Sequence, residues 1–599
     1  MIVYGDPQFD CAYLAIIDAL SERVAQTNSD DLDDLRTLLI QVGQLEQAVC
    51  DLAQLREERR IAVCDLTDKA ALTFYSAYSR MNPSLPARSE CSKTLLQRLI
   101  EQLRELGKFG DERLIIKVPE GFEFYALYPE QYCCAARDFL HTVSQSARSR
   151  QSALIVGIRS IGTTLSALVK IALEGAGWVV ERITVRPTGH PYDRQAQLEA
   201  LGSRRFDWGI VVDEGPGISG SSMASVARGL STAGINRVAF FPGHNGSPGA
   251  GASTEVRQIW KATPRFFTPL DLVSWNGATL HNALLRDSQA NCDGVQDLDD
   301  VSGGLWRKHA FSNEREWPAA CIPLERMKFL AGSKPGYRLL WKFQGFGSLQ
   351  EENPSAKRNS PLSVTPLSSR FGFVAEPWIE GKRLTAEDAE DERTLESICD
   401  YIVSCCSEPL QSEEQRRGIH RLGEMLYWNT KEALGDAHAD SARAALALVE
   451  GLPSWPPYRD GRMAPWEWIQ DSAGRIWKTD CTGHDSDHTM IGKQALLWDI
   501  AGTIVEWNLR PATRHNFLIF LHKRGIEIES QHLKFFQLAY TAFRMGQCSL
   551  CAMVCGPDSA EGSRLQSAAD RYRSMLKGHT LTASDEQNRV ATDVRRWSR

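Results

Sequence analysis

The sequence predicts an α/β protein in which a parallel-sheet domain follows a helical region and precedes an α+β domain. Three observations predict this. Apolar positions recur at helical intervals over residues 1–110, short apolar runs alternate with amphipathic helical segments over 111–290, and a mixed segment over 305–555 gives way to long helical runs. Alternating strands and helices are typical of a parallel sheet covered by helices.

Two stretches lack the pattern of a folded core. Residues 291–304 are acidic, poor in large apolar side chains and rich in turn residues, so we expect an acidic linker. Residues 556–599 are polar and basic, which predicts a flexible tail. A chain of 599 residues accommodates the resulting three or four domains of ordinary size.

The composition excludes several classes of partner. A net charge of −7 provides no basic field for nucleic acid, and uninterrupted apolar stretches long enough for a membrane span are absent. The first ten residues lack the basic region of a secretory signal, and fifteen irregularly spaced cysteines suit reduced thiols. We therefore expect a cytoplasmic protein with small-molecule partners, without nucleic-acid or membrane partners, and we allow for a homodimer.

A candidate sugar-phosphate site follows the apolar run Trp208 to Val212. Asp213 and Glu214 end that run, and a turn of small residues then leads into an amphipathic helix. Small residues let the backbone approach a phosphate, and the helix N-terminus binds anions. Two carboxylates there would repel a phosphate unless they bound ribose hydroxyls or Mg²⁺. The turn and helix start provide Gly215, Gly217, Ser219, Gly220, Ser221 and Ser222.

The run VVDEGPGISGSS resembles the signature of type I phosphoribosyltransferases. Two upstream segments follow in the order of that family. GIRSIG is similar to its pyrophosphate loop, and RPTGHPYDRQ is similar to its mobile catalytic loop. The resemblance covers residues 150–250. Its candidate residues in these segments are Gly157, Arg159, Ser160 and Gly162 in the first, and Arg186, His190 and Arg194 in the second.

The resemblance implies a Mg²⁺-dependent transferase. In that family a nucleobase-like acceptor displaces pyrophosphate from 5-phosphoribosyl-1-pyrophosphate, and the N-glycosidic bond is made or broken. Asp213 and Glu214 would be catalytic and metal-binding, and His244 could touch the acceptor. A closing cationic loop would neutralise the leaving pyrophosphate and exclude water. Simpler interpretations are acids that cap a helix, and histidines with only local hydrogen bonds.

The C-terminal half carries a second resemblance. GYRLLWKFQGFG places Lys342 in a strand, FGFVAEPWIEGKRL resembles a kinase hinge, and YRDGRMAPWEWIQDSAGRIWKTD ends at Asp480. This order resembles the aminoglycoside-phosphotransferase-like kinases. The resemblance implies that Lys342 meets ATP phosphates, that Asp480 holds Mg²⁺ and that Asp499 braces the catalytic loop. If the resemblance is set aside, the simpler interpretations are that Lys342 is an exposed lysine on a strand and that Asp499 caps the N-terminus of a helix.

The catalytic loop departs from that family. Arg462 stands where the catalytic aspartate is expected, and Glu467 stands where the metal-binding asparagine is expected. Asp460 could replace the missing base, and Glu467 could ligate a metal, because both supply carboxylate oxygen to a hard cation.

Together these patterns predict a phosphoribosyltransferase fused to a kinase-like module that acts on a related nucleoside or sugar, with ATP as the nucleotide of the C-terminal domain. Two alternatives stay open. One is a regulatory protein that binds phosphoribosyl pyrophosphate or ATP without turnover. The other is a small-molecule phosphotransferase whose N-terminal site is vestigial.

Overall fold

The computed structural model describes most of the chain. The described residues are 1–599 without 3–7, 89, 111, 145–150, 191, 199–204, 218, 250, 293, 333–337, 348, 350–359, 405–408, 458–459, 482–488, 490, 492–493 and 581–599.

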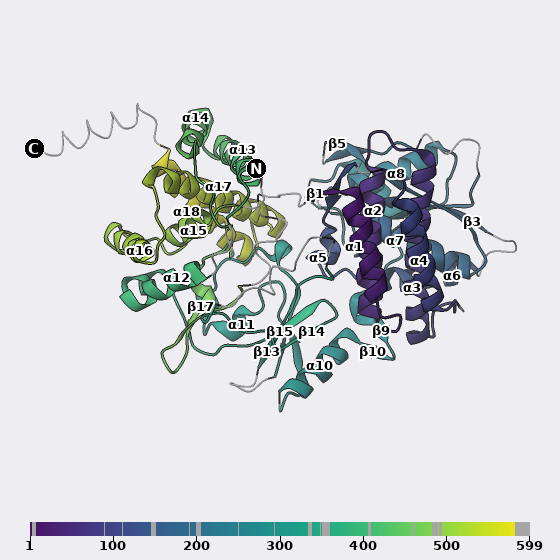
Figure 1. Cartoon of the computed structure of the whole chain (residues 1–599), viewed down its shortest axis with the longest axis horizontal. Helices are drawn as coiled ribbons and strands as arrows, with labels where there is room; N and C mark the ends of the chain where they lie inside the picture. The colour runs from purple at the N-terminus through teal and green to yellow at the C-terminus, as the bar shows by residue number, and fades with distance from the viewer. Residues whose placement is uncertain are drawn as a thin grey trace, which may run out of the picture.

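Four helices that lie side by side dominate the N-terminal region (Figure 1). Their amphipathic faces bury leucines at helical spacing, as Leu95, Leu99 and Leu103 do in α4, and α2 and α3 pack against α7 of the following segment. The strand β1 pairs with β2 in antiparallel register. The elements are β1 (Gln8–Ala12), α1 (Tyr13–Gln26), α2 (Leu32–Cys50), α3 (Glu57–Met81), α4 (Ser92–Leu106) and β2 (Arg113–Lys117).

A four-stranded parallel sheet follows, in the order β4-β3-β7-β8, which confirms the predicted parallel sheet and mixed α/β class. Alternate residues of β3 face opposite sides: Ala153 and Ile155 join a core with the N-terminal helices, whereas Leu154 and Val156 join one with α8. The elements of this part are α5 (Glu120–Glu123), α6 (Pro129–Ser144), β3 (Ser152–Ile158), α7 (Ile161–Gly175), β4 (Val179–Val185), β5 (Thr188–His190), β6 (Asp193–Gln195), β7 (Trp208–Val212), α8 (Ser221–Thr232), β8 (Val238–Phe241), α9 (Thr254–Ala262), β9 (Ser274–Trp275), β10 (Ala278–Thr279) and α10 (Leu280–Asn291).

The C-terminal half begins with a five-stranded antiparallel sheet, in the order β11-β12-β13-β15-β14, and a three-stranded sheet β16-β17-β18. The segment predicted as an acidic linker contributes β11 to the edge of the larger sheet, where it pairs with β12. The strands are β11 (Leu298–Asp300), β12 (Lys328–Ala331), β13 (Leu339–Phe343), β14 (Ser368–Arg370), β15 (Phe373–Pro377), β16 (Lys382–Arg383), β17 (Trp468–Gln470) and β18 (Ile476–Lys478).

Helices complete the C-terminal half around a second apolar core (Figure 1). The predicted flexible tail contains α18, which packs on α17 and buries Leu565, Ala569, Tyr572 and Leu576; residues 581–599 lie outside the described part. Within that part, none of the helices is both long and apolar enough to cross a membrane. The helices are α11 (Arg307–Ala310), α12 (Glu392–Ser404), α13 (Ser412–Leu434), α14 (Asp436–Ala444), α15 (Leu497–Glu506), α16 (Pro511–Lys523), α17 (Ser530–Cys555) and α18 (Ala560–His579).

Candidate functional site

A cavity of about 140 Å³ is lined by residues of both C-terminal sheets and of the loops between them. Its charged lining is slightly basic, with six cationic and five acidic side chains, which favours an anionic ligand. The cationic residues are Arg326, Lys328, Lys342, Arg383, Arg462 and Arg544, and the acidic residues are Glu325, Glu376, Glu467, Asp480 and Glu506.

Lys342 and Asp480 meet at this cavity from different sheets. Lys342 lies in β13, Asp480 follows β18, and the ammonium donates to Oδ1 of Asp480. Lys342 is 4% exposed, so its interpretation as an exposed strand lysine is wrong. Burial lowers the pKa of Lys342, and Asp480 opposes that shift. Because burial penalises the ammonium charge, a phosphate placed beside Lys342 would stabilise it.

Asp499 holds the loop that precedes β17. Its carboxylate accepts the backbone N–H of Gly461 at 2.8 Å and that of Asp460 at 3.2 Å. Asp499 lies within the first turn of α15, whose N-cap is Leu496, so Asp499 does not cap its own helix. The carboxylate therefore braces the loop from a helix nearly forty residues later in the chain.

Asp460, the predicted substitute for the base, lies outside the lining of this cavity. It is fully buried, and its carboxylate binds Nζ of Lys478 at 2.8 Å and the hydroxyl of Tyr401 at 2.7 Å. Glu467 does line the cavity and binds the same Lys478 at 3.0 Å. Two of the carboxylates that reach the cavity, Glu467 and Asp480, could thus bind a hard cation.

The segment that resembles a kinase hinge forms another wall of the cavity, through Glu376, Pro377, Trp378 and Ile379. Here the backbone N–H of Trp378 donates to the carbonyl of Arg338 at 2.9 Å. Arg383 places its guanidinium over the rings of Trp306 and Trp378, at 5.4 and 5.5 Å from their centroids. Burial lowers the pKa of Arg383 to about 10, which leaves it charged at neutral pH.

The sequence did not predict the aromatic and arginine walls of this cavity. Trp306 comes from a segment without a motif, and Arg383 lies at the end of the hinge-like segment but was not a candidate residue. Glu506 and Arg544 form an ion pair at 3.0 Å between α15 and α17. Such contacts join positions far apart in the chain, so no local pattern marks them.

A second candidate site lies at the carboxyl ends of β3 and β7. β3 lies between β4 and β7 in the sheet, so the chain goes from β3 to β4 on one side and then crosses to β7 on the other side. Open α/β sheets bind ligands at the point where the strand order reverses in this way. Two glycines bring the turns together: a Cβ on Gly162 would lie 2.4 Å from the carbonyl oxygen of Val212, and one on Gly157 would lie 2.3 Å from the carbonyl oxygen of Gly162. Both positions therefore require glycine for close packing.

Asp213 and Glu214 are half-buried at this edge. Tyr132 donates its hydroxyl to the carbonyl of Asp213 at 2.7 Å, which fixes the backbone there. Burial raises the pKa of Asp213 to about 7. The pKa of Glu214 is raised well above its usual value by burial and then by the charges of Glu120 and Asp213. These crowded acids favour a cation or hydroxyl donors between them.

The small-residue turn after Glu214 leads into α8. Gly220 is its N-cap, at φ 66°, and has no side chain with which to satisfy the first amides of the helix. The hydroxyls of Ser219 and Ser221 lie 2.9 Å apart, and Ser222 follows in the first turn. Gly217 is exposed, whereas Pro216 and Gly220 are buried, so the turn reaches solvent at Gly217. Since Gly220 is the N-cap, the two acids do not cap α8.

Arg159 and Arg186, from the predicted pyrophosphate and catalytic loops, both contact Asp51, which was not a candidate residue in the sequence. Asp51, at the end of α2, binds Nε of Arg186 at 2.8 Å and lies 3.3 Å from Nε of Arg159. Arg159 also donates to the carbonyl of Cys50 at 2.7 Å. Ser160 is the N-cap of α7. The N-terminal helical region therefore holds both arginines beside the second site.

The predicted catalytic loop forms a small hairpin of β5 and β6 rather than irregular structure. His190 accepts the backbone N–H of Tyr192 at 3.3 Å, and Arg194 donates to the carbonyl of Gly189 at 2.9 Å. His244 accepts the backbone N–H of Gly246 at 3.0 Å, and burial lowers its pKa. Both histidines thus make local hydrogen bonds, as in the simpler interpretation.

The raised pKa of Asp213 predicts a pH-dependent stability difference. Because the folded state holds the proton of Asp213 more tightly than the unfolded state, stability is greatest below the unfolded pKa near 4, where the group is protonated in both states, and falls as pH rises to about 7. We expect Asp213→Asn to match the wild type below about pH 4 and to be more stable by roughly 2 to 4 kcal/mol above pH 7. Urea denaturation across this range measures the difference. The exposed Asp271→Asn is the control, and a gap for Asp213→Asn that does not change with pH would contradict the burial argument.

No family model matches the sequence, and no curated protein matches it. The resemblance to phosphoribosyltransferases therefore stays a prediction.

Several solved kinase structures align with about half of the chain. The choline kinase LicA from Streptococcus pneumoniae aligns at 11% identity over 49% of this chain and 98% of its own, with a TM-score of 0.31. The macrolide 2'-phosphotransferase MphH from Brachybacterium faecium aligns at 16% identity over 48% and 97%, with a TM-score of 0.30. A thermostable mutant of the aminoglycoside phosphotransferase APH(4)-Ia aligns at 12% identity over 47% and 95%, with a TM-score of 0.29. Values this low establish neither a shared activity nor a shared substrate.

Proposed function

We propose that the C-terminal half is a nucleotide-dependent phosphotransferase that acts on a small molecule. The observation that carries this proposal is the meeting of Lys342 and Asp480 from separate sheets at one cavity with a slightly basic lining. In nucleotide-dependent kinases a lysine neutralises the phosphates of the nucleoside triphosphate by direct contact. A neighbouring aspartate does so indirectly, by holding the Mg²⁺ that binds those phosphates. The hinge-like segment at Trp378 would then receive the base.

The roles of the remaining residues follow from their positions. Glu467 and Asp480 would hold the divalent cation, because both carboxylates line the cavity. Asp499 would keep the loop that carries Glu467 in place through two backbone amides. Asp460 would serve structure rather than proton transfer, since it is buried in an ion pair with Lys478.

The test is transfer of the γ-phosphate from ATP, in Mg²⁺, to a panel of small alcohols, amino alcohols and nucleosides. We expect a phosphorylated product with at least one acceptor and loss of product in Lys342→Ala, while the exposed Lys534→Ala retains activity. ATP binding with no transfer to any acceptor and no hydrolysis would favour the regulatory alternative.

A second function is favoured by a separate observation, the acidic pair at the reversal point of the parallel sheet. We propose that Asp213 and Glu214 bind the ribose hydroxyls or Mg²⁺ of phosphoribosyl pyrophosphate, while amides of residues 219–222 bind its 5-phosphate. The open turn at Gly217 and the N-terminus of α8 support this arrangement. The pyrophosphate would lie near Gly162 and the guanidinium of Arg159.

Calorimetry with Mg²⁺ and 5-phosphoribosyl-1-pyrophosphate tests this second site. We expect the double variant Asp213→Asn plus Glu214→Gln to lose binding roughly 10-fold or more, because amides replace both carboxyl groups that would bind the ribose hydroxyls or Mg²⁺. Asp271→Asn should bind as the wild type does. If the double variant bound the ligand with the affinity of the wild type, the assignment of Asp213 and Glu214 would be wrong. If binding is lost as expected, an assay of pyrophosphate release with a panel of nucleobases distinguishes a transferase from a sensor.

A further inference from the structure

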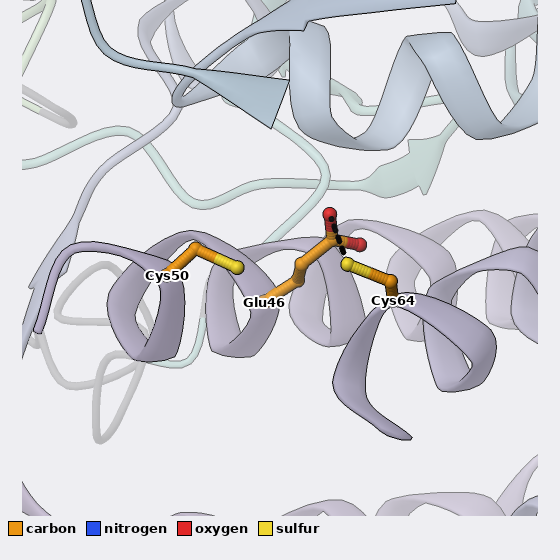
Figure 2. A group of neighbouring side chains, drawn as sticks. All are labelled: Glu46, Cys50 and Cys64. Atoms are coloured by element: carbon orange, nitrogen blue, oxygen red, sulfur yellow. Dashed lines mark hydrogen bonds between the residues drawn. The ribbon is translucent and has the colours of Figure 1, made fainter. Parts of the chain in front are cut away.

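A carboxylate and two thiols come together outside both candidate sites. Glu46 and Cys50 lie one turn apart on α2, and Cys64 approaches them from α3 (Figure 2). One ligand atom from each residue lies within 4.8 Å of the others. The thiol of Cys64 donates to Oε1 of Glu46 at 3.5 Å. Two helices therefore bring three potential metal-binding atoms close to one another.

The spacing agrees with tetrahedral coordination. A sulfur at about 2.3 Å and an oxygen at about 2.0 Å from one zinc ion lie about 3.5 Å apart at the tetrahedral angle. Glu46 and Cys64 already have this separation. The other pairs of ligand atoms lie within 4.8 Å of each other, so side-chain movements of about 1 Å would bring all three atoms to bonding distance from one metal ion.

The neighbouring arginine orients the carboxylate without using all of its acceptor capacity. Arg182 donates to both oxygens of Glu46 at 2.9 Å, and it also donates to the carbonyl of Cys64 at 3.0 Å. An ionised carboxylate has about four lone-pair positions, so two remain for a metal once the Cys64 thiol gives up its proton and its hydrogen bond to Oε1. Outer contacts of this kind fix a ligand in metal sites.

The charges also balance. Two thiolates, one carboxylate and a divalent cation sum to −1, which the guanidinium of Arg182 offsets, because Lys170 balances the other acid that pairs with Arg182, Asp68. The thiolate is the form that binds metals. Glu46 is fully buried, whereas Cys50 and Cys64 are half-buried, so a fourth position can hold water.

We propose that Glu46, Cys50 and Cys64 bind a thiophilic divalent cation, Zn²⁺ by the chemistry of the ligands, which links α2 to α3. Sites with three protein ligands and one water are a common zinc arrangement. The ion would also fix the end of α2, where the carbonyl of Cys50 accepts from Arg159. Metal binding at this site can be measured separately from both proposed activities.

The test uses the full-length chain, reduced and stripped of metal with a chelator. Titration with Zn²⁺ is followed by calorimetry, and titration with Cd²⁺ by the ultraviolet charge-transfer band of sulfur bound to cadmium. We expect one tight site per chain. Cys50→Ser, Cys64→Ser and Glu46→Gln should each weaken it by about 10-fold or more. Cys91→Ser, which changes an exposed cysteine elsewhere, should bind as the wild type does.

Circular dichroism shows whether each variant is folded, and Cys50→Ser is the most conservative because the residue is half-buried at a helix end. The proposal is overturned if Cys50→Ser plus Cys64→Ser keeps the cadmium band and the affinity of the wild type. It is equally overturned if the reduced chain binds neither metal and the oxidised chain instead carries a Cys50–Cys64 disulfide.

Discussion

Asp480→Asn is expected to reduce nucleotide-dependent phosphate transfer by roughly 100-fold or more, because it removes a charge that would hold Mg²⁺ against the transferring phosphate. The carboxylate of Asp480 already pairs with Lys342 at the cavity. The variant should also need a higher Mg²⁺ concentration for half-maximal rate. Steady-state kinetics over a Mg²⁺ series measures both quantities.

The matched control for this prediction is Asp440→Asn on the exposed face of α14. It should leave the rate and the Mg²⁺ requirement unchanged. If Asp480→Asn kept the wild-type rate at every Mg²⁺ concentration, Asp480 could not be a ligand of the catalytic cation, and the assignment of the cavity would be lost.

Glu130→Gln is expected to destabilise the N-terminal part of the chain by about 3 to 5 kcal/mol. Arg36 of α2 and Glu130 of α6 form an ion pair in which both side chains have no exposed surface. Trp275 also donates its indole N–H to Glu130 at 2.9 Å. Removing the carboxylate charge leaves a buried guanidinium poorly compensated. Urea denaturation followed by circular dichroism measures the change.

A neighbouring acid provides the control. Asp33 also binds Arg36, but its side chain is 43% exposed, so Asp33→Asn should cost much less. The double variant Arg36→Met plus Glu130→Leu should recover part of the loss, because no unpaired charge remains buried. A loss of less than about 1 kcal/mol for Glu130→Gln would show that the pair contributes little to the fold.

The central sheet could be predicted because each strand is a short apolar run followed by small residues. SALIVG became β3 and WGIVV became β7, and both turns lie at the carboxyl edge, as the strand-turn-helix pattern predicted. In the C-terminal half, the sequence identified Lys342, on a predicted strand, and Asp480, at the end of another, as separate candidate residues. The fold brings their side chains together.

Other elements were missed for physical reasons. β11 is a three-residue edge strand with a single buried side chain, Leu298, so its acidic composition outweighed the pattern. In α18, Leu565, Ala569, Tyr572 and Leu576 follow helical spacing, but the polar residues between them made the segment resemble a tail.

Contacts between distant segments were beyond any local pattern. Asp51 binds Arg159 and Arg186 only because α2 packs beside the parallel sheet. Asp460 is a carboxylate two residues before the position expected for the catalytic base, yet its pairing with Lys478 is visible only in the fold.

Equilibrium binding of ATP to the full-length chain tests the central claim most directly. In Mg²⁺, calorimetry should show one site per chain that disappears in Lys342→Ala and weakens when Mg²⁺ is chelated, while Lys534→Ala binds normally. Heats that are the same in wild type and Lys342→Ala, or no binding at millimolar ATP, would contradict a nucleotide site at this cavity.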